Sequence, residues 1–241
     1  MPLPTVIARG DTGHGEVALR RRGEVLELIV DGVFAMDSAH TDTEVALAGL
    51  ALDRLPRHQP DPPGHPSGRP HSPDHGWRVV IGGLGLGFTA RAALADQRVV
   101  AVQVVELQSL LVDWAREGLV PPVAELLEDP RLRVEVGDVI DVVGRLPRGS
   151  VDAILLDVDN GPGFLVHEHN ASVYRTPFLT SAIAALTAGG VVAVWSADPD
   201  PSLPVALHAA GGGEVDEVLL DVERDGRRFR YAVYLARSPR P

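Results

Sequence analysis

One short segment, residues 78–89, constrains the fold of this chain more than any other. The β-branched run 79–81 is typical of a strand, the stretch 82–87 of a tight turn, and the apolar spacing after it of a helix. A helix that begins directly after such a turn presents free backbone N–H groups and the positive end of its dipole to ligands. Glycine lets ligand atoms approach the backbone without meeting a Cβ atom. The segment therefore predicts a ligand-binding loop with four candidate contact residues: Gly82, Gly83, Gly85 and Gly87.

Strand-like and helix-like patterns alternate after this segment, which indicates a parallel sheet with crossover helices. The strands are expected at residues 79–81, 99–105, 132–136, 153–156 and 191–195. The helices are expected at residues 89–95, 109–117, 123–128, 139–145 and 176–186. The glycines of Ala188-Gly189-Gly190 are expected to end the last of these helices.

The end of the chain carries a different pattern. Two strand-like runs, 215–222 and 228–235, flank Asp225-Gly226, which is a hairpin signal. A parallel α/β sheet that finishes in an antiparallel hairpin is the layout of the S-adenosylmethionine-dependent transferases. The expected fold class is therefore an α/β, Rossmann-like sheet of that type, preceded by a small N-terminal β-unit.

Composition predicts three segments. Residues 1–55 read as a β-hairpin unit followed by a helix at 43–55, whose candidate core residues are Val45, Leu47, Leu50, Leu52 and Leu55. Residues 56–76 are rich in Pro, His and Gly and read as a linker or surface loop, because they lack apolar anchors. A metal-binding tract is the alternative, but its histidines lack regular spacing. Residues 77–241 form the expected nucleoside-binding transferase domain.

Charge and cysteine content exclude several classes of function. The formal net charge is −11, which argues against nucleic acid as a partner, because phosphate binding rests on Lys and Arg. Cysteine is absent, so the chain has neither disulfides nor a thiolate site. No run of about eighteen apolar residues predicts a membrane span, and the N-terminus lacks a signal-peptide layout. We expect a cytoplasmic protein.

Three acidic residues follow three successive strands of the expected sheet: Glu106, Asp138 and Asp157. Ligands of an open α/β sheet bind outside the carboxyl ends of the strands, so these carboxylates should converge on the glycine loop. A carboxylate after the second strand can accept both hydroxyls of a ribose, and Asp138 can accept from an exocyclic amine. Asp157 points to where chemistry would occur. Solvated residues at strand ends are the alternative interpretation of each acid.

A nicotinamide cofactor is a competing interpretation, since Gly85-Leu86-Gly87-Phe88-Thr89-Ala90 fits G-x-G-x-x-A and Glu106 lies about twenty residues further on. Asp138, the terminal hairpin and the lack of a recognisable substrate domain all speak against it.

On these residues the chain resembles the spermidine synthase (polyamine aminopropyltransferase) family, in particular its divergent bacterial members. The matching segments are Val30-Asp31-Gly32-Val33, Gly82-Gly83-Leu84-Gly85-Leu86-Gly87, Val105-Glu106-Leu107, Asp129-Pro130-Arg131-Leu132, Gly137-Asp138, Leu156-Asp157-Val158-Asp159-Asn160-Gly161-Pro162 and Ala188-Gly189-Gly190-Val191.

The resemblance implies a transferase that uses S-adenosylmethionine or decarboxylated S-adenosylmethionine and no metal. Glu106 would then hold the ribose and Asp138 the adenine end, while Asp157 binds or deprotonates the attacking amine. Asp159 and Tyr174 are further candidate substrate-binding residues. A small amine such as putrescine is the implied acceptor. We also expect a homodimer, formed partly through the N-terminal β-unit, because a hairpin of that size needs a partner surface.

The chain departs from the family pattern on the polyamine side. Leu84 and Leu86 stand in the region where the family has an aspartate, and Asp159 is shifted by one residue from the family's second carboxylate. Two alternatives therefore remain open: a small-molecule methyltransferase that uses S-adenosylmethionine, and a non-catalytic homologue that binds a nucleoside.

Overall fold

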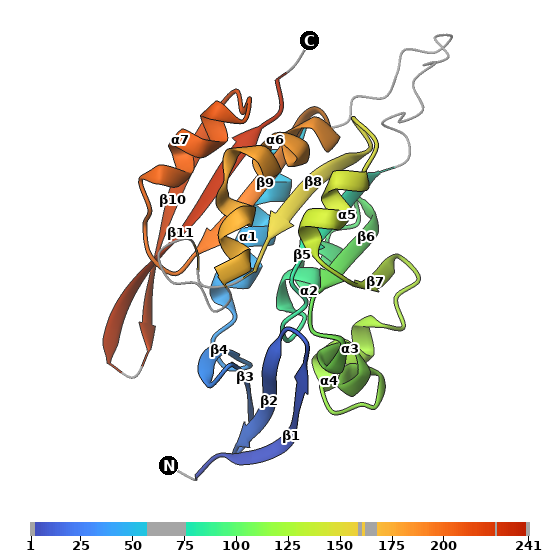
Figure 1. Cartoon of the computed structure of the whole chain (residues 1–241), viewed down its shortest axis with the longest axis vertical. Helices are drawn as coiled ribbons and strands as arrows, with labels where there is room; N and C mark the ends of the chain where they lie inside the picture. The colour runs from blue at the N-terminus through green and yellow to red at the C-terminus, as the bar shows by residue number, and fades with distance from the viewer. Residues whose placement is uncertain (1–2, 57–75, 159–160, 162–167, 225, 240–241) are drawn as a thin grey trace.

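The computed structural model describes residues 3–56, 76–158, 161, 168–224 and 226–239. These residues form two sheets (Figure 1). A four-stranded antiparallel sheet has the order β1-β2-β3-β4, and a seven-stranded sheet has the order β10-β11-β9-β8-β5-β6-β7. The expected linker lies almost entirely at residues 57–75, outside the described residues.

The smaller sheet consists of β1 (Thr5–Thr12), β2 (Gly15–Arg22), β3 (Val25–Val30) and β4 (Val33–Asp37). The turn between β3 and β4 lies at Asp31 and Gly32, which both have positive φ, 49° and 76°. The sequence analysis missed β1. Its residues are all exposed or half-buried, so they show none of the clear alternation that marks a strand with one buried face.

The larger sheet has the expected transferase-type topology. It consists of β5 (Trp77–Gly82), β6 (Val99–Glu106), β7 (Leu132–Val136), β8 (Val151–Leu156), β9 (Leu186–Ser196), β10 (Val215–Arg224) and β11 (Arg227–Arg237). Strands β5 to β9 pair in parallel, and β11 inserts between β9 and β10 in antiparallel pairing with both. The predicted fold class is confirmed.

The strand order reverses at β5, and this reversal determines where a ligand can bind. The chain runs from β5 outward to β6 and β7, and then returns to place β8 on the other side of β5. Crossover helices leave in opposite directions at such a point and open a crevice at the carboxyl ends of the strands.

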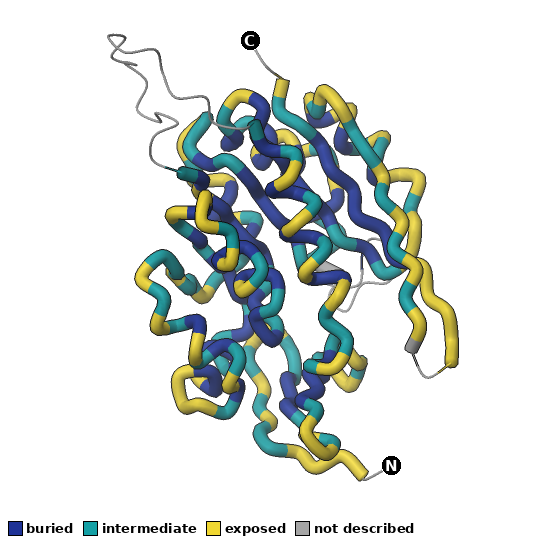
Figure 2. Tube along the Cα trace, turned by 180° about the vertical axis from the view of Figure 1, so that it is seen from behind, coloured by how far each residue is buried: buried dark blue, intermediate teal, exposed yellow. Residues whose placement is uncertain are grey.

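Helices cover both faces of the larger sheet (Figure 1). One face carries α1 (Asp42–Asp53), α2 (Phe88–Ala95), α3 (Ser109–Arg116) and α4 (Pro121–Leu126), and the other α5 (Val139–Arg145), α6 (Thr176–Ala185) and α7 (Ser202–Ala209). Alternate strand residues point to opposite faces, so Val79 and Ile81 enter one core while Val80 enters the other. In Figure 2 the strands of this sheet form the buried interior, and the tip of the β10–β11 hairpin is exposed.

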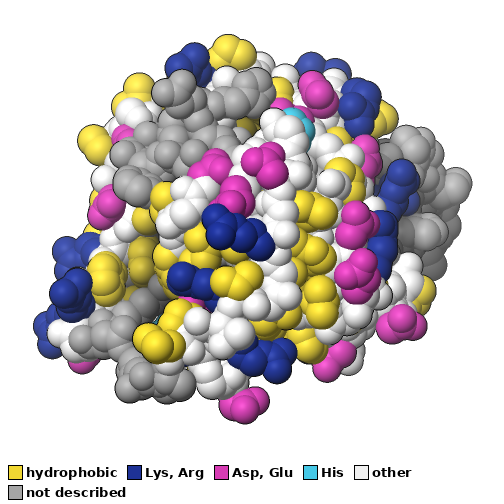
Figure 3. Space-filling model, turned by 60° about the horizontal axis from the view of Figure 1, so that its bottom comes forward, with side chains coloured by type: hydrophobic (Ala, Val, Ile, Leu, Met, Phe, Trp, Pro, Cys, Tyr) yellow, Lys and Arg dark blue, Asp and Glu magenta, His cyan; other side chains and the backbone are white. Residues whose placement is uncertain are grey.

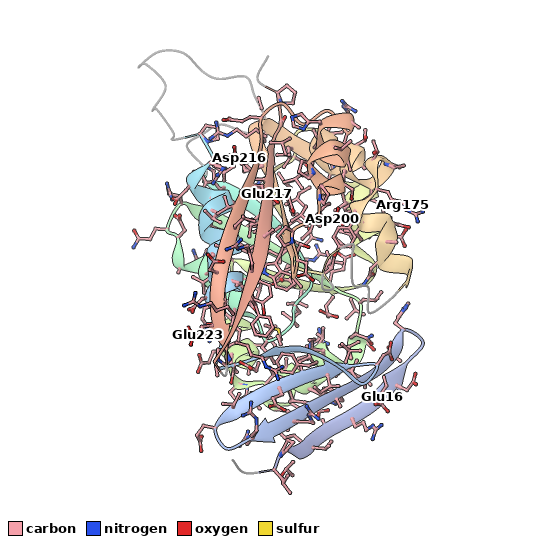
Figure 4. All side chains as sticks on the ribbon, turned by 90° about the vertical axis from the view of Figure 1, so that its left-hand side faces the viewer. Glu16, Arg175, Asp200, Asp216, Glu217 and Glu223 are labelled. Carbon is pink, nitrogen blue, oxygen red and sulfur yellow. The ribbon has the colours of Figure 1, made fainter. Side chains whose placement is uncertain are left out.

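The buried hydroxyl of Tyr234 links the terminal hairpin to the loop before α7. It accepts a hydrogen bond of 2.6 Å from the backbone N–H of Asp200 and donates one of 2.8 Å to Glu217 on β10. Figure 4 labels Asp200 and Glu217 and shows the smaller sheet, which carries Glu16, at the opposite end of the molecule.

Two sequence expectations about local structure are wrong. Helix α6 ends at Ala185, and Gly190 lies inside β9 instead of ending the helix. A Cβ atom on Gly190 would lie 2.8 Å from the carbonyl oxygen of Asp152, so this glycine permits close strand packing. Val45 is 48% exposed, because α1 buries the face that carries Leu47 and Ala51.

Candidate functional site

A cavity lies at the carboxyl ends of β5, β6 and β8, the place that the reversal of strand order predicts. It contains about 1070 Å³ of space, including the part open to solvent. The smaller sheet closes one side with apolar side chains, and the glycine loop and the acidic strand ends form the other. The described lining residues are Val17, Leu28, Val30, Ala35, Met36, Glu44, Gly83, Gly85, Val105, Glu106, Leu107, Gln108, Leu111, Gly137, Asp138, Val139, Asp157, Val158, Asn170 and Trp195.

The four candidate glycines divide into two pairs. Gly83 and Gly85 line the cavity and have positive φ, 92° and 50°. Gly82 and Gly87 are absent from its described lining. A Cβ atom on Gly82 would lie 2.9 Å from Val139, and one on Gly87 would lie 2.9 Å from Leu126. Gly83 and Gly85 are closely packed too, since a Cβ atom would clash with the backbone of Asp157 at Gly83 and with Met36 at Gly85. The ligand contacts expected of Gly82 and Gly87 do not follow from the structure.

Glu106 is a buried carboxylate that is fixed in orientation by backbone donors. Its two oxygens accept hydrogen bonds of 2.7 Å each, one from the N–H of Leu84 and one from the N–H of Gln108. Burial raises the pKa of Glu106, while hydrogen bonds from backbone N–H groups oppose that rise. The backbone groups that lower the pKa of Glu106 are those of Gln108, Leu84, Gly85 and Leu107, so the carboxylate is held in place on the cavity lining.

Gln108 is a site residue that the sequence analysis missed. Its side chain donates a 2.8 Å hydrogen bond to the carbonyl of His14 and accepts one of 2.5 Å from Thr12. The same residue therefore supports Glu106 through its backbone and holds the β1–β2 turn through its side chain. No local sequence signal reveals this, because the partners lie about ninety residues away in the chain.

Asp138 lies at the N-cap of α5 and lines the cavity. Its side-chain oxygen accepts a hydrogen bond of 2.7 Å from the backbone N–H of Ile140. The capping bond fixes the direction of the carboxylate relative to the cavity. The residue thus combines a helix-capping role with a place in the lining of the cavity.

Asp157 directly follows β8, and its carboxylate accepts a 2.5 Å hydrogen bond from the hydroxyl of Thr89. Its pKa is raised to about 7, chiefly by burial and secondly by the negative charge of Glu44, while the bond from Thr89 acts in the opposite direction. A carboxylate that exchanges its proton near neutral pH is suited to accept a proton from an amine.

Glu44 is the second site residue that the sequence analysis missed. It lies in the first turn of α1, is 7% exposed, and accepts a 2.7 Å hydrogen bond from the hydroxyl of Thr43. An acidic residue in the first turn of a helix is normally explained by the helix dipole, so the sequence offered no sign of its burial in a cavity. The fold places it in the lining of the same cavity as Asp157, which lies more than a hundred residues later in the chain.

The two remaining candidate site residues are Tyr174 and Asp159. Tyr174 is buried, and its hydroxyl donates a 2.6 Å hydrogen bond to the carbonyl of Val158. It is not among the described lining residues of the cavity, and its hydrogen bond holds the segment that follows β8. Asp159 lies outside the described residues.

All the titratable side chains in the described lining of the cavity are acidic. Its described lining contains four carboxylates and no Arg or His side chain: Glu44, Glu106, Asp138 and Asp157. Low-dielectric walls strengthen the field of such a group of charges, which favours cationic ligands. Among the residues that the structure describes, no group of three or more His, Cys, Asp or Glu could hold a metal ion.

The cavity thus combines the backbone of the glycine loop, the fixed carboxylate of Glu106 and an acidic lining that favours positively charged ligands. No helix in the described part of the chain is long and apolar enough to cross a membrane.

No protein-family model matches the sequence, but individual relatives do. Spermidine synthase 2 from Hyoscyamus niger is 31% identical over 116 residues, which are 47% of this chain and 35% of that protein. Putrescine N-methyltransferase 4 from Nicotiana tabacum is 31% identical over 117 residues, which are 48% of this chain and 28% of that protein. The matches thus cover about a third of the length of these curated relatives.

Solved structures resemble the chain over almost its whole length. A spermidine synthase in complex with the transition-state analogue AdoDATO has a TM-score of 0.75 and 17% identity, and the match covers 98% of this chain and 74% of that one. Spermidine synthase from Thermotoga maritima has a TM-score of 0.73 and 17% identity, with 98% and 73% covered. The predicted resemblance to the spermidine synthases is confirmed in sequence and in fold.

Proposed function

We propose that this spermidine synthase-like chain is a transferase that binds decarboxylated S-adenosylmethionine, or S-adenosylmethionine itself, and moves an aminopropyl group to an amine such as putrescine. The observation that carries this proposal is the cavity at the strand reversal, whose described lining is acidic and contains no basic side chain. Both proposed substrates are cations, and both would enter a cavity of opposite charge.

The nucleoside end is assigned to the glycine loop and two carboxylates. Glu106, held by the N–H groups of Leu84 and Gln108, would accept the ribose hydroxyls. Asp138 would accept from the exocyclic amine of adenine. Gly83 and Gly85 present backbone to the cavity beside these carboxylates.

The reacting end is assigned to Asp157. When bound, the sulfonium supplies a carbon that is already activated, so the protein needs no electrophile of its own. Asp157 would orient the amine in line with that carbon and accept the proton that the amine must lose before it attacks. Thr89 holds the carboxylate in place for this task.

The test is product analysis. Purified protein is incubated with each sulfonium nucleoside and putrescine, and the products are identified by mass spectrometry. Methylthioadenosine together with an aminopropylated amine supports the proposal. A run in which neither nucleoside is consumed, although it binds, identifies the non-catalytic alternative.

A methyltransferase is the second candidate. One support is the glycine loop, where Leu84 and Leu86 provide no charged side chain to bind the group attached to the sulfur of the nucleoside. The other support is the similarity to a putrescine N-methyltransferase. S-adenosylhomocysteine in the same incubation would identify this activity.

A homodimer and a cytoplasmic location remain predictions. Val6 and Phe34 on the smaller sheet are 51% and 41% exposed, which supports the use of this sheet as a contact surface between subunits. Figure 3, which brings this end of the molecule forward, shows hydrophobic side chains gathered between charged ones.

A further inference from the structure

The side chain of Met36 reaches from the smaller sheet to the glycine loop. Its Sδ atom accepts a hydrogen bond of 3.2 Å from the backbone N–H of Leu86. A Cβ atom on Gly85 would lie 2.5 Å from the same sulfur, so this glycine makes room for the thioether. Met36 belongs to β4 and pairs with Leu28 of β3, and both residues line the cavity. The smaller sheet therefore places a side chain against the loop that the sequence predicts to bind a ligand.

The backbone N–H groups of a turn between a strand and a helix are donors that normally serve an anion. Each of the five N–H groups from residue 83 to residue 87 has a partner within the protein: the carbonyl of Val105 for Gly83, the carboxylate of Glu106 for Leu84 and Gly85, the sulfur of Met36 for Leu86, and the carbonyl of Leu84 for Gly87. A thioether sulfur is a weak acceptor compared with a carbonyl or a carboxylate. The N–H of Leu86 is therefore the donor at which an anion would compete best, and Met36 occupies its acceptor position.

The two sulfonium nucleosides of the proposed function differ in one group. S-adenosylmethionine carries a carboxylate on the chain attached to its sulfur, whereas the decarboxylated form does not. A carboxylate in this cavity would need donors to offset its burial and the repulsion from the acidic lining. The loop is the natural source of such donors, and Met36 closes it at Leu86. The decarboxylated form has no group that requires them.

We propose that Met36 is a specificity-determining residue that excludes the carboxylate of S-adenosylmethionine from the N–H of Leu86 and thereby selects the decarboxylated sulfonium. The inference rests on the proposed function and narrows its nucleoside substrate to a sulfonium without an anionic group. The side chains of Leu84 and Leu86 carry no charge that could repel a carboxylate. The exclusion therefore depends on the space that the thioether fills.

Calorimetric titration of the protein with each sulfonium, without an acceptor amine, tests the inference. We expect the unaltered chain to bind S-adenosylmethionine at least about tenfold more weakly than its decarboxylated form, since the occupied loop cannot give its carboxylate a charge-assisted hydrogen bond. Met36→Val removes the sulfur and shortens the side chain, and valine suits a strand. This variant should bind S-adenosylmethionine at least about tenfold more tightly than the unaltered chain does, with little change for the decarboxylated form.

Met36→Leu is the matched control, because leucine keeps most of the volume of methionine but has no sulfur. It should retain most of the preference for the decarboxylated form, since the exclusion is steric. Methylthioadenosine has no carboxylate, so we expect it to bind the unaltered chain and both variants with similar affinity. This titration shows that each variant still forms the cavity.

A second measurement uses the unaltered chain and does not depend on the folding of a shortened variant. The sequence contains two methionines, Met1 and Met36, so methionine labelled with carbon-13 at its methyl group gives two signals. The signal that is missing in Met36→Leu belongs to Met36. Methylthioadenosine should shift this signal, whereas S-adenosylhomocysteine, which carries the carboxylate, should leave it unchanged at the same concentration.

The possible failures can be told apart. Equal affinity of the unaltered chain for the two sulfoniums overturns the inference and leaves nucleoside binding intact. A preference that is as strong in Met36→Val as in Met36→Leu removes the role of Met36, and so does a Met36 signal that stays unchanged while methylthioadenosine binds. If the unaltered chain binds none of these nucleosides, the inference and the proposed function are both wrong.

Discussion

Thr89, at the start of α2, donates a 2.5 Å hydrogen bond to the carboxylate of Asp157, at the end of β8. The bond joins α2, the helix after the glycine loop, to the residue that follows β8, the strand paired with β5. It also favours the ionised form of a carboxylate whose pKa is raised to about 7 by burial and by Glu44.

Removal of the Thr89 hydroxyl should change the pH dependence of the reaction. Thr89→Val takes away a bond that favours ionised Asp157, so the pKa of Asp157 should rise further. The ascending limb of kcat/KM against pH should move to higher pH by about 0.5–1 unit, in keeping with one lost hydrogen bond to a charged group. Glu44→Gln should move the same limb to lower pH. Limbs that coincide in all three proteins would mean that Asp157 does not control the profile.

Asp157→Asn should abolish most of the turnover. We expect kcat to fall at least about a hundredfold, as for the loss of a general base, with nucleoside affinity little changed. Rates are measured by product formation and affinity by titration. Asp221→Asn, on the exposed part of β10, serves as the control and should behave as the unaltered protein does. Equal rates in Asp157→Asn and its control would remove the proposed role of Asp157.

Glu106→Gln should weaken nucleoside binding. The amide has only one acceptor oxygen, so it cannot serve the N–H groups of both Leu84 and Gln108. One buried donor is left unsatisfied, which should lower the free energy of unfolding by about 1–3 kcal/mol. We expect nucleoside affinity to drop at least about tenfold for the same reason, and both quantities can be measured by urea unfolding with and without nucleoside. A variant with normal affinity would show that Glu106 supports only the loop.

The protein should lose stability as the pH rises from about 4 to about 7. The raised pKa of Asp157 means that the folded state binds more protons than the unfolded state in this window, so stability is greatest below the unfolded pKa and declines through the folded one. A shift of about three units corresponds to a decline of up to about 4 kcal/mol. Urea unfolding at several pH values measures it, and Asp157→Asn should flatten the curve. A curve that is equally steep in this variant would assign the decline to other groups.

The local sequence pattern was sufficient to predict most of the architecture. The strand–glycine–helix segment, the alternation after it and the Asp225-Gly226 hairpin signal predicted the topology, because period-two runs and turn residues act over a few neighbouring positions. The same segments placed Glu106, Asp138 and Asp157 at strand ends, and parallel strands bring such ends to one edge.

The sequence by itself determined the order of the elements and three acids of the cavity, since both depend on residues close together in the chain. Only the tertiary structure decided that Glu44 lines the same cavity as Asp157, that Gln108 joins the smaller sheet to Glu106, and that Gly82 and Gly87 serve packing. These relationships depend on how α1 and the smaller sheet pack against distant segments. No local periodicity encodes such contacts, because the energy that selects them comes from burial across the whole fold.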